Sequence, residues 1–256
     1  MTDQPQPADP TTGAPMPSGA STGAGNAATP VQVGAMFDRI ASVYDLMNAV
    51  MSGFQEPRWR NLAVHLANLA PGMRAIDVAT GTGKVAATLG DQVGERGRIL
   101  GVDVSPGMIG QARHAYGGRP QLEFVVGDAM DLPTVGGEFD AATIAFGMRN
   151  LPDYERGFAE MRRAVRPGGL VVCLEIARPP HLIGRLGRVW FERAVPVLGR
   201  LIGQGDAYGY LVESVRNYPD PERIAATMRD AGLVQVSWMP LTAGMVTIHV
   251  GRRPAR

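Results

Sequence analysis

The sequence predicts an α/β fold with a doubly wound, mostly parallel seven-stranded sheet and an antiparallel hairpin at one edge. Three observations carry this prediction. From Arg74 onward, short apolar runs alternate with helical stretches, which is typical of parallel strands joined by right-handed crossovers. A glycine-rich turn separates the first run from the first helical stretch. The last two runs are separated only by residues 240–245, too few for a helical crossover, so we expect them to pair antiparallel.

The chain divides into a tail and one domain. Residues 1–30 consist mostly of Pro, Gly, Ala, Ser and Thr and contain no aromatic residue, so we expect a disordered low-complexity tail. Residues 31–256 are expected to form the domain. It begins with a helical cap over 31–70, where apolar residues recur at three- and four-residue steps and where Gly53 and Pro57 break the helix.

Seven apolar runs supply the strands, and four amphipathic stretches supply the helices between them. The expected strands are 75–79, 99–103, 122–126, 141–146, 170–176, 234–239 and 246–250, and the expected helices are 84–94, 106–116, 153–165 and 222–231. Residues 178–217 interrupt the alternation. Long insertions at the carboxyl ends of such a sheet cover the ligand crevice, so we expect a lid there.

The composition excludes several classes of function. Lys and Arg number 25 against 24 Asp and Glu, a net charge of +1, which argues against a broad basic surface for nucleic acid. The one cysteine, Cys173, excludes an internal disulfide framework and lies in an apolar run that predicts a buried strand. No cluster has the spacing of metal ligands. The tail lacks the basic and apolar regions of a signal peptide, and no apolar run reaches roughly 18 residues, so we expect a cytoplasmic protein.

The sharpest local motif is the turn after the first expected strand, Thr80-Gly81-Thr82-Gly83. Glycines let the backbone approach a ligand closely, and the helix that follows presents free N–H groups. The spacing also fits a dinucleotide fingerprint, because Asp103 follows Gly83 by twenty residues. The motif alone therefore leaves nicotinamide cofactors and S-adenosylmethionine open.

Three acids at successive strand ends favour S-adenosylmethionine. Asp77 precedes the glycine turn, where a carboxylate can meet an ammonium group and would repel a pyrophosphate. Asp103 ends the second strand and can accept both ribose hydroxyls, and Asp128 follows the third strand, where it can accept the adenine amino hydrogens. Each acid taken singly could be a helix cap or a loop acid. Together they suit a cationic nucleoside without phosphate.

Further blocks lie at the fourth strand end and in the flanking regions, and by themselves they indicate core aromatics, caps and turns. Together with the glycine turn they resemble the quinone-biosynthesis C-methyltransferases of the demethylmenaquinone and ubiquinone pathways, over about Val33 to Arg252. The matching blocks are YDLMNAVMS followed by Trp59, the AxGTG turn, FDAATIAFGMRNLPD, RAVRPGGLVVCLEI, AYGYLVES and LTAGMVTIH. The chain departs from the family pattern at Glu56, Lys84 and Ala145, where the family usually has His, Asp and Ser.

The resemblance implies a class I S-adenosylmethionine-dependent methyltransferase with a Rossmann-like fold. It implies C-methylation of a demethylated prenyl quinol, with demethylmenaquinol to menaquinol as the first expectation. A ubiquinone-pathway benzoquinol or another phenolic acceptor is the alternative. The expected cofactor site comprises Asp77, Gly81, Thr82, Gly83, Asp103, Asp128 and Ala129. A nicotinamide-dependent oxidoreductase and a non-catalytic binding module are the rival classes.

The resemblance also places Arg149 at the reacting end of the pocket, with Asn150 and Tyr44 close by. A guanidinium keeps its proton at ordinary pH and is a poor direct base, so we expect Arg149 to stabilise the quinolate oxygen or to orient a water that removes the hydroxyl proton. The alternative is a structural ion pair, for example with Asp153.

Residues 181–202 combine apolar positions at helical spacing with an excess of arginine, which is typical of helices that lie on anionic membranes. We therefore expect a cytoplasmic enzyme with peripheral contact at the inner face of the cell membrane. The lipophilic quinol is the expected partner, and the sequence leaves a homodimer open.

Overall fold

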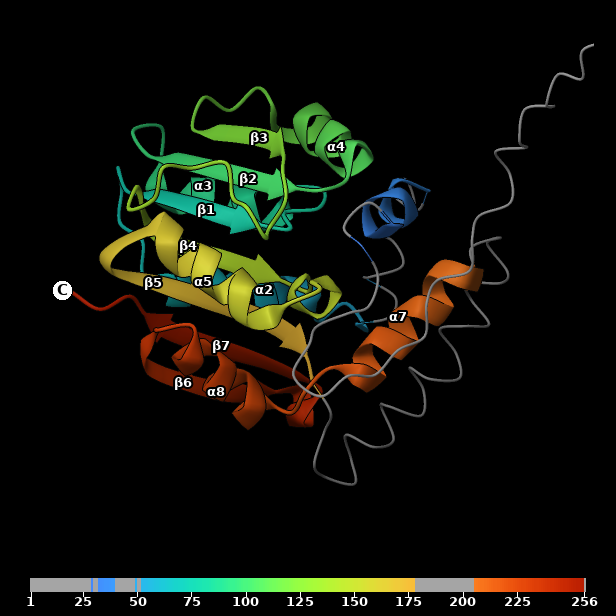
Figure 1. Cartoon of the computed structure of the whole chain (residues 1–256). Helices are drawn as coiled ribbons and strands as arrows, with labels where there is room; N and C mark the ends of the chain where they lie inside the picture. The colour runs from blue at the N-terminus through green and yellow to red at the C-terminus, as the bar shows by residue number, and fades with distance from the viewer. Residues whose placement is uncertain (1–28, 30–31, 40–48, 50–51, 178–204, 256) are drawn as a thin grey trace, which may run out of the picture.

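The computed structural model describes residues 29, 32–39, 49, 52–177 and 205–255 (Figure 1). The expected disordered tail and most of the expected lid lie outside these residues, as does Tyr44. Those expectations stay predictions. In the described part of the expected insertion, residues 205–217 are helical.

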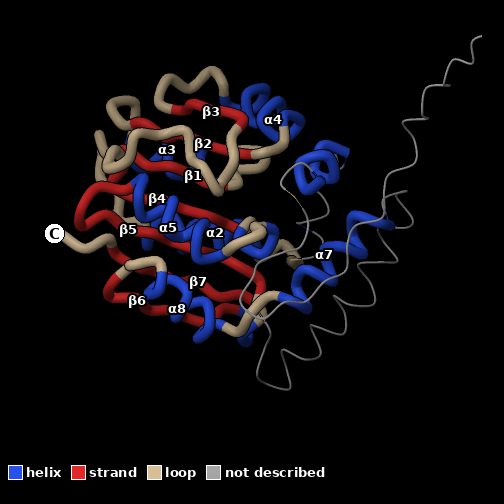
Figure 2. Tube along the Cα trace, in the orientation of Figure 1, coloured by secondary structure: helices blue, strands red, loops and turns tan. Residues whose placement is uncertain are grey.

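Seven strands form one sheet in the order β3-β2-β1-β4-β5-β7-β6 (Figures 1 and 2). The first five pair in parallel, and β7 runs antiparallel between β5 and β6. The bounds are β1 Arg74–Val78, β2 Arg98–Asp103, β3 Leu122–Val126, β4 Phe139–Ala145, β5 Val165–Ile176, β6 Val234–Leu241 and β7 Val246–Arg252. The predicted fold class is thus confirmed, including the antiparallel edge hairpin.

Helices pack on both faces of the sheet. They are α2 Glu56–Leu66, α3 Lys84–Val93, α4 Pro106–Tyr116, α5 Tyr154–Ala164 and α8 Pro221–Asp230. The helix α7 Gly205–Asn217 and the helical residues 32–39 lie beyond the carboxyl ends of the strands (Figure 1). Local chemistry explains several of their starts. The side chains of Ser105, Asp153 and Asp220 each accept a hydrogen bond from the backbone amide three residues further on, at the N-termini of α4, α5 and α8.

The expected strands and the four expected helices have bounds within two residues of those observed, except at the start of β5. The two helical stretches of the cap are separated near Gly53 and Pro57, as expected: α2 begins at Glu56, and Pro57 lies in its first turn, where its missing N–H costs no hydrogen bond. The strand β5 begins at Val165, five residues before the expected start, because Val165 pairs with Phe139 across an irregularity in the β4–β5 register. The expected strand start at 170 was therefore wrong.

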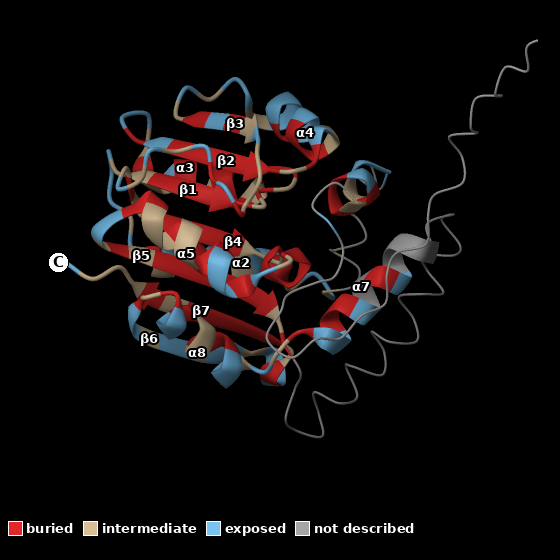
Figure 3. Cartoon of the chain, in the orientation of Figure 1, coloured by how far each residue is buried: buried red, intermediate tan, exposed pale blue. Residues whose placement is uncertain are grey.

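The core has two parts, one on each face of the sheet (Figure 3). Successive residues of a strand point to opposite faces. On β1, Ile76 packs with Phe158 and Met161 of α5, whereas Ala75 belongs to the cluster formed with α2 and α3. Cys173 is fully buried, as its apolar setting predicted, and burial raises the pKa of its thiol well above the usual value.

The strand order reverses between β1 and β4. From β1 the chain moves outward to β2 and β3, and then returns to β4 on the other side of β1. Loops leave the carboxyl ends of β1 and β4 in opposite directions at such a point, which opens the crevice where ligands bind in doubly wound sheets.

Candidate active site

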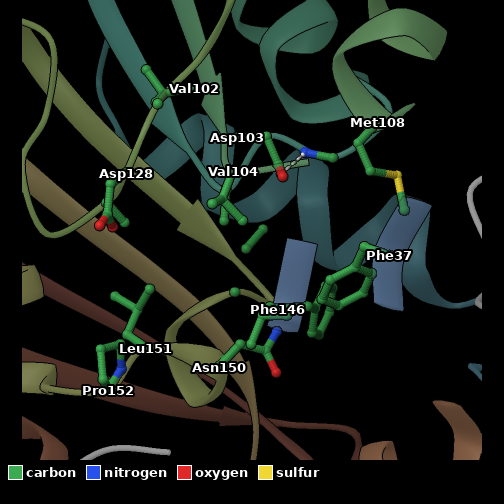
Figure 4. A pocket seen from close by; sticks show the side chains of 17 residues that line it. Phe37, Val102, Asp103, Val104, Met108, Asp128, Phe146, Asn150, Leu151 and Pro152 are labelled. Carbon is green, nitrogen blue, oxygen red and sulfur yellow. Dashed lines mark hydrogen bonds between the residues drawn. The ribbon is translucent and has the colours of Figure 1, made fainter. Parts of the chain in front are cut away.

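A pocket with about 670 Å³ of space, its open mouth included, lies at the carboxyl ends of the first four strands (Figure 4). Every one of these strand ends contributes to its wall. The helix 32–39 closes one side with Val33 and Phe37, and Met108 of α4 adds an apolar contact. The wall also contains Gly81, Asp103, Asp128, Ala129, Phe146, Gly147, Asn150, Leu151 and Pro152. A pocket of this size and mixed character suits a small organic ligand.

The glycine turn forms the floor beside β1. Gly81 has a φ of +56°, and a Cβ there would meet no atom within 4 Å, so the backbone itself lines the pocket. Gly83 has a φ of +83°, and a Cβ there would lie 2.9 Å from the ring of Phe124. Both positions therefore favour glycine, one for approach to a ligand and one for packing. Thr82 is buried within the turn, and neither it nor Gly83 is among the pocket-lining residues.

Asp103 is held rigidly at the end of β2. One carboxylate oxygen accepts the Gly81 amide at 2.8 Å and the other accepts the Ser105 amide at 2.9 Å. Burial raises the pKa of this carboxyl above its usual value, and the nearby charge of Asp38 raises it further, while the two amides lower it. The side chain lines the pocket, where the sequence placed it.

Asp128 and Ala129 also line the pocket, directly after β3. Oδ1 of Asp128 accepts the Met130 amide at 2.9 Å, which orients the carboxylate. The structure thus brings Asp103 and Asp128 to one cavity with Gly81, as the strand-end pattern predicted, although Asp103 is 22 residues from Gly81 in the sequence. Their contacts with a cofactor stay predictions.

Asp77 lies beneath the glycine turn and does not line the pocket described. Its two oxygens accept the hydroxyls of Thr80 and Thr143, each at 2.6 Å. Burial raises the pKa of this carboxyl to about 6, against the lowering effects of the two hydroxyls and of the Ala86 amide. The predicted contact with an ammonium group stays a prediction.

Arg149 is 3 % exposed and lies in the short 3-10 helix η1 (Met148–Asn150) after β4. Its Nη1 lies 2.6 Å from Oε1 of Glu175 and donates to the Phe146 carbonyl at 2.5 Å. The alternative that the sequence left open, a structural ion pair, is present, but with Glu175 and not with Asp153, whose side chain caps α5. The guanidinium is not part of the pocket wall. Sequence reasoning missed Glu175, since no spacing rule links β5 to η1.

Asn150 lines the pocket beside Arg149. Its Oδ1 accepts the hydroxyl of Tyr210 in α7 at 3.4 Å. An amide whose oxygen is engaged in this way turns its NH₂ group to other acceptors. Tyr44, the third residue expected at the reacting end, lies outside the described residues.

Two residues at the switch point have strained backbones. Ala79 after β1 has a φ of +52° and Phe146 after β4 has a φ of +58°. Such conformations cost about 1–3 kcal/mol each and cluster at functional sites. The loops touch, because a Cβ on Gly147 would lie 2.5 Å from Cβ of Ala79. Ala and Phe are not residue types that predict a positive φ, so the sequence did not indicate these two conformations.

Blocks far apart in the sequence meet next to the pocket. Nε1 of Trp59 in α2 donates to Oγ1 of Thr242 at 2.9 Å, and its ring lies 6.2 Å from that of Phe146. Of the three departures from the family pattern, Ala145 lines the pocket, whereas Glu56 and Lys84 begin α2 and α3 and are not among the lining residues.

The helix 32–39 is fixed over the pocket by Asp38. Its Oδ1 accepts the Ser105 hydroxyl at 2.5 Å and the Gly107 amide at 2.8 Å, at the N-terminus of α4. Gly34 allows the approach, because a Cβ there would lie 3.3 Å from the Val104 carbonyl oxygen. The sequence predicted this helix but did not indicate the contacts of Asp38 with α4 that hold it.

The strand order and the pocket at the switch point define the fold of class I methyltransferases, and solved structures share this fold. The chain is similar to a SAM-dependent methyltransferase from Aquifex aeolicus, with a TM-score of 0.55 and 17 % identity over 72 % of this chain and 84 % of that one. It is also similar to the [4+2]-cyclase SpnF, with a TM-score of 0.68 and 19 % identity over 92 % and 100 %. Because the second is named a cyclase, the fold alone does not fix the reaction.

The chain belongs to the ubiE/COQ5 methyltransferase family, whose model matches residues 25–253. A demethylmenaquinone methyltransferase from Bacillus pumilus is 38 % identical over 226 residues, covering 87 % of this chain and 97 % of that protein. One from Thermus thermophilus is 43 % identical over 222 residues, covering 86 % and 100 %. The expected methyltransferase family is thus confirmed, against the rival oxidoreductase.

Two further features of the described residues concern metal binding and the membrane. Among the described residues, no three His, Cys, Asp or Glu side chains gather in a way that could hold a metal ion. No helix in the described part of the chain has both the length and the apolar character needed to cross a membrane.

Proposed function

We propose that this protein methylates a ring carbon of demethylmenaquinol, with S-adenosylmethionine as the methyl donor and menaquinol as the product. The observation that carries the proposal is the near full-length similarity to demethylmenaquinone methyltransferases. The pocket supports it. Two carboxylates and exposed glycine backbone stand beside apolar side chains, a set that fits a cationic nucleoside next to an aromatic acceptor.

The pocket residues have two roles in the proposal: some bind the methyl donor, and others exclude water. Asp103 and Asp128 hold the ribose and adenine parts of the donor through hydrogen bonds. Val33, Phe37 and Leu151 exclude water from the pocket, which strengthens electrostatic interactions inside it. When bound, S-adenosylmethionine supplies an electrophilic methyl group on a positively charged sulfur.

The acceptor side centres on η1. The ring carbon becomes nucleophilic when the neighbouring hydroxyl loses its proton, so the protein must favour the resulting quinolate. Asn150 lines the pocket and can donate its NH₂ group to that oxygen. Arg149 lies behind it, where its positive charge favours the quinolate or orients the water that takes the proton. Tyr44 completes this end in the proposal.

The test is a mass measurement. The protein is incubated with S-adenosylmethionine and either demethylmenaquinol or the corresponding demethylated benzoquinol, and the extracted quinol is analysed. We expect a gain of one methyl group on the naphthoquinol, and none with heat-inactivated protein. Methylation of the benzoquinol alone would assign the ubiquinone-pathway alternative, and methylation of neither would overturn the proposal.

Asp103→Ala is expected to weaken binding of S-adenosylmethionine by about 1.5–3 kcal/mol, roughly 10- to 150-fold, because hydrogen bonds to a charged group are lost. Isothermal titration calorimetry measures this. Asp91→Ala is the matched control, since it removes an exposed carboxylate that pairs with Arg119 at the surface. Unchanged affinity in Asp103→Ala would remove this residue from the cofactor site.

The proposal includes contact with the inner face of the cell membrane, where a prenyl quinol resides. Its support is the composition of residues 181–202, whose arginines are Arg185, Arg188, Arg193 and Arg200 against the single acid Glu192. We expect co-sedimentation with vesicles containing phosphatidylglycerol, and we expect it to weaken in 0.5 M salt and on changing the four arginines to Gln.

The matched control for the vesicle experiment changes Arg98 and Arg166 to Gln, because both are exposed and lie elsewhere in the fold. Vesicle binding that is unchanged both in 0.5 M salt and after loss of the four arginines would contradict an electrostatic contact with the membrane. The proposal leaves a homodimer open, which sedimentation velocity decides.

A further inference from the structure

The carboxylate of Asp77 is unusual in its burial and in its partners. It is 1 % exposed, and each of its oxygens accepts a threonine hydroxyl at 2.6 Å, from Thr80 in the turn and from Thr143 in β4. β1 and β4 pair in parallel with Asp77 opposite Thr143, so the two side chains share the sheet face that α3 covers. The hydroxyl of Thr143 therefore reaches Asp77 from a fixed position on a central strand.

The Asp77 carboxylate also interacts with the first turn of α3. The N-cap of α3 is Gly83, which has no side chain to accept the first amides of the helix. The Ala86 amide in the first turn of α3 instead interacts with Asp77. Strand, turn and helix start are thus joined through one buried carboxylate, two residues before the backbone that lines the pocket.

We propose that Thr143 is a positioning residue for S-adenosylmethionine: together with Thr80, its hydroxyl keeps Asp77 an oriented carboxylate beneath the glycine turn. This inference rests on the proposed cofactor. An isolated buried carboxylate takes up a proton, whereas hydroxyl donors favour the charged form. The charged form attracts the cationic donor and holds the turn. Thr143 does this without touching the ligand.

The surroundings determine the sign of the pH dependence. Burial is the largest influence and raises the pKa of Asp77 to about 6, and the negative charge of Asp103 on β2 adds to this. The other charged residues on these elements are Lys84 and Asp91 of α3, Arg74 of β1, Arg98 of β2 and Asp140 of β4, and of these Lys84 directly follows the glycine turn. Affinity for the donor should be full above this pKa and should fall as the pH drops through it. Loss of one hydroxyl donor should raise the pKa of Asp77 by about one unit, so the affinity for the donor should begin to decrease at a higher pH.

The experiment measures the Kd of S-adenosylmethionine by calorimetry between pH 5.5 and pH 8 for the wild type and for Thr143→Val, which has nearly the same shape. The ratio of the two Kd values cancels the titration of the ligand itself. We expect a ratio near one at pH 8 that rises to about fivefold at pH 6, for a pKa one unit higher. Thr143→Ser should restore the wild-type profile.

Two further variants serve as a control and as a second test of the inference. Thr247→Val is the matched control, because this buried threonine of β7 has a hydroxyl without a hydrogen-bond partner among the described residues. Thr80→Val removes the other hydroxyl and should shift the profile the same way, which keeps the test valid if Thr143→Val does not fold. A ratio that stays constant with pH, or no loss at all, would overturn the inference. A wild type that binds no S-adenosylmethionine would overturn the proposed function and the inference with it.

Discussion

Arg149→Lys is expected to lose turnover by about 10²-fold or more while the protein stays folded and binds S-adenosylmethionine like the wild type. The guanidinium joins the Glu175 carboxylate, at 2.6 Å, to the Phe146 carbonyl, at 2.5 Å. A lysine keeps the positive charge but replaces the rigid planar guanidinium, whose Nη1 makes both contacts, with a single ammonium on a flexible stem. The loss expected is that of one preorganised electrostatic group at a reacting centre. Steady-state kinetics with saturating donor measure it.

Arg253→Lys is the control for this change, because Arg253 also donates to backbone carbonyls but lies away from the pocket. Its turnover should be unchanged. A well-folded Arg149→Lys protein with normal turnover would show that the chemistry lies elsewhere. A lowered melting temperature with full turnover of the folded fraction would make Arg149 a structural residue only.

Glu175→Ala is expected to lower the free energy of unfolding by about 3–5 kcal/mol, because it leaves the buried Arg149 charge without its counterion. Glu175 is fully buried, and besides the ion pair its carboxylate accepts the backbone amides of Arg149 at 3.2 Å and Ile176 at 2.8 Å. Urea denaturation followed by circular dichroism measures the change, provided that the slope of the transition is the same in both proteins.

Two comparisons show whether the ion pair causes the effect. Glu123→Ala breaks the exposed pair with Arg98 and should change stability by about 1 kcal/mol or less. The double variant Arg149→Leu and Glu175→Leu removes both buried charges, so it should regain most of the stability but no turnover. Equal stability of Glu175→Ala and the wild type would contradict the ion pair as a structural element.

The sequence allowed prediction of those parts of the site that depend on local pattern. Gly81 was recognisable because a glycine turn between strand and helix has few other uses, and Asp103 because it ends a strand whose direction the alternation already implied. The carboxyl ends of parallel strands lie at one edge of the sheet, so sequence position was enough to bring Asp103 and Asp128 to one pocket. The break before α2 was predictable from Gly53 and Pro57, because a proline fits the first turn of a helix but not its interior.

Other parts depended on contacts between distant residues. The role of Asp77 was predicted from its place before the turn, yet its hydroxyl partner Thr143 lies 66 residues away. Arg149 follows β4, but its ion-pair partner Glu175 lies on β5, 26 residues away, and no spacing rule pointed to it. Trp59 and Thr242 are 183 residues apart and meet only because α2 and the β6–β7 turn reach the same edge of the sheet.

The sequence by itself determined the sheet, the glycine turn and the acids at the strand ends, because each follows from periodicity or turn chemistry within a few residues. Only the tertiary structure decided which buried charges are paired, which hydroxyls hold Asp77, and which backbones are strained at Ala79 and Phe146. The physical reason is that these features are set by distances across neighbouring strands and loops. Such distances depend on strand order and register, which local patterns constrain but do not specify.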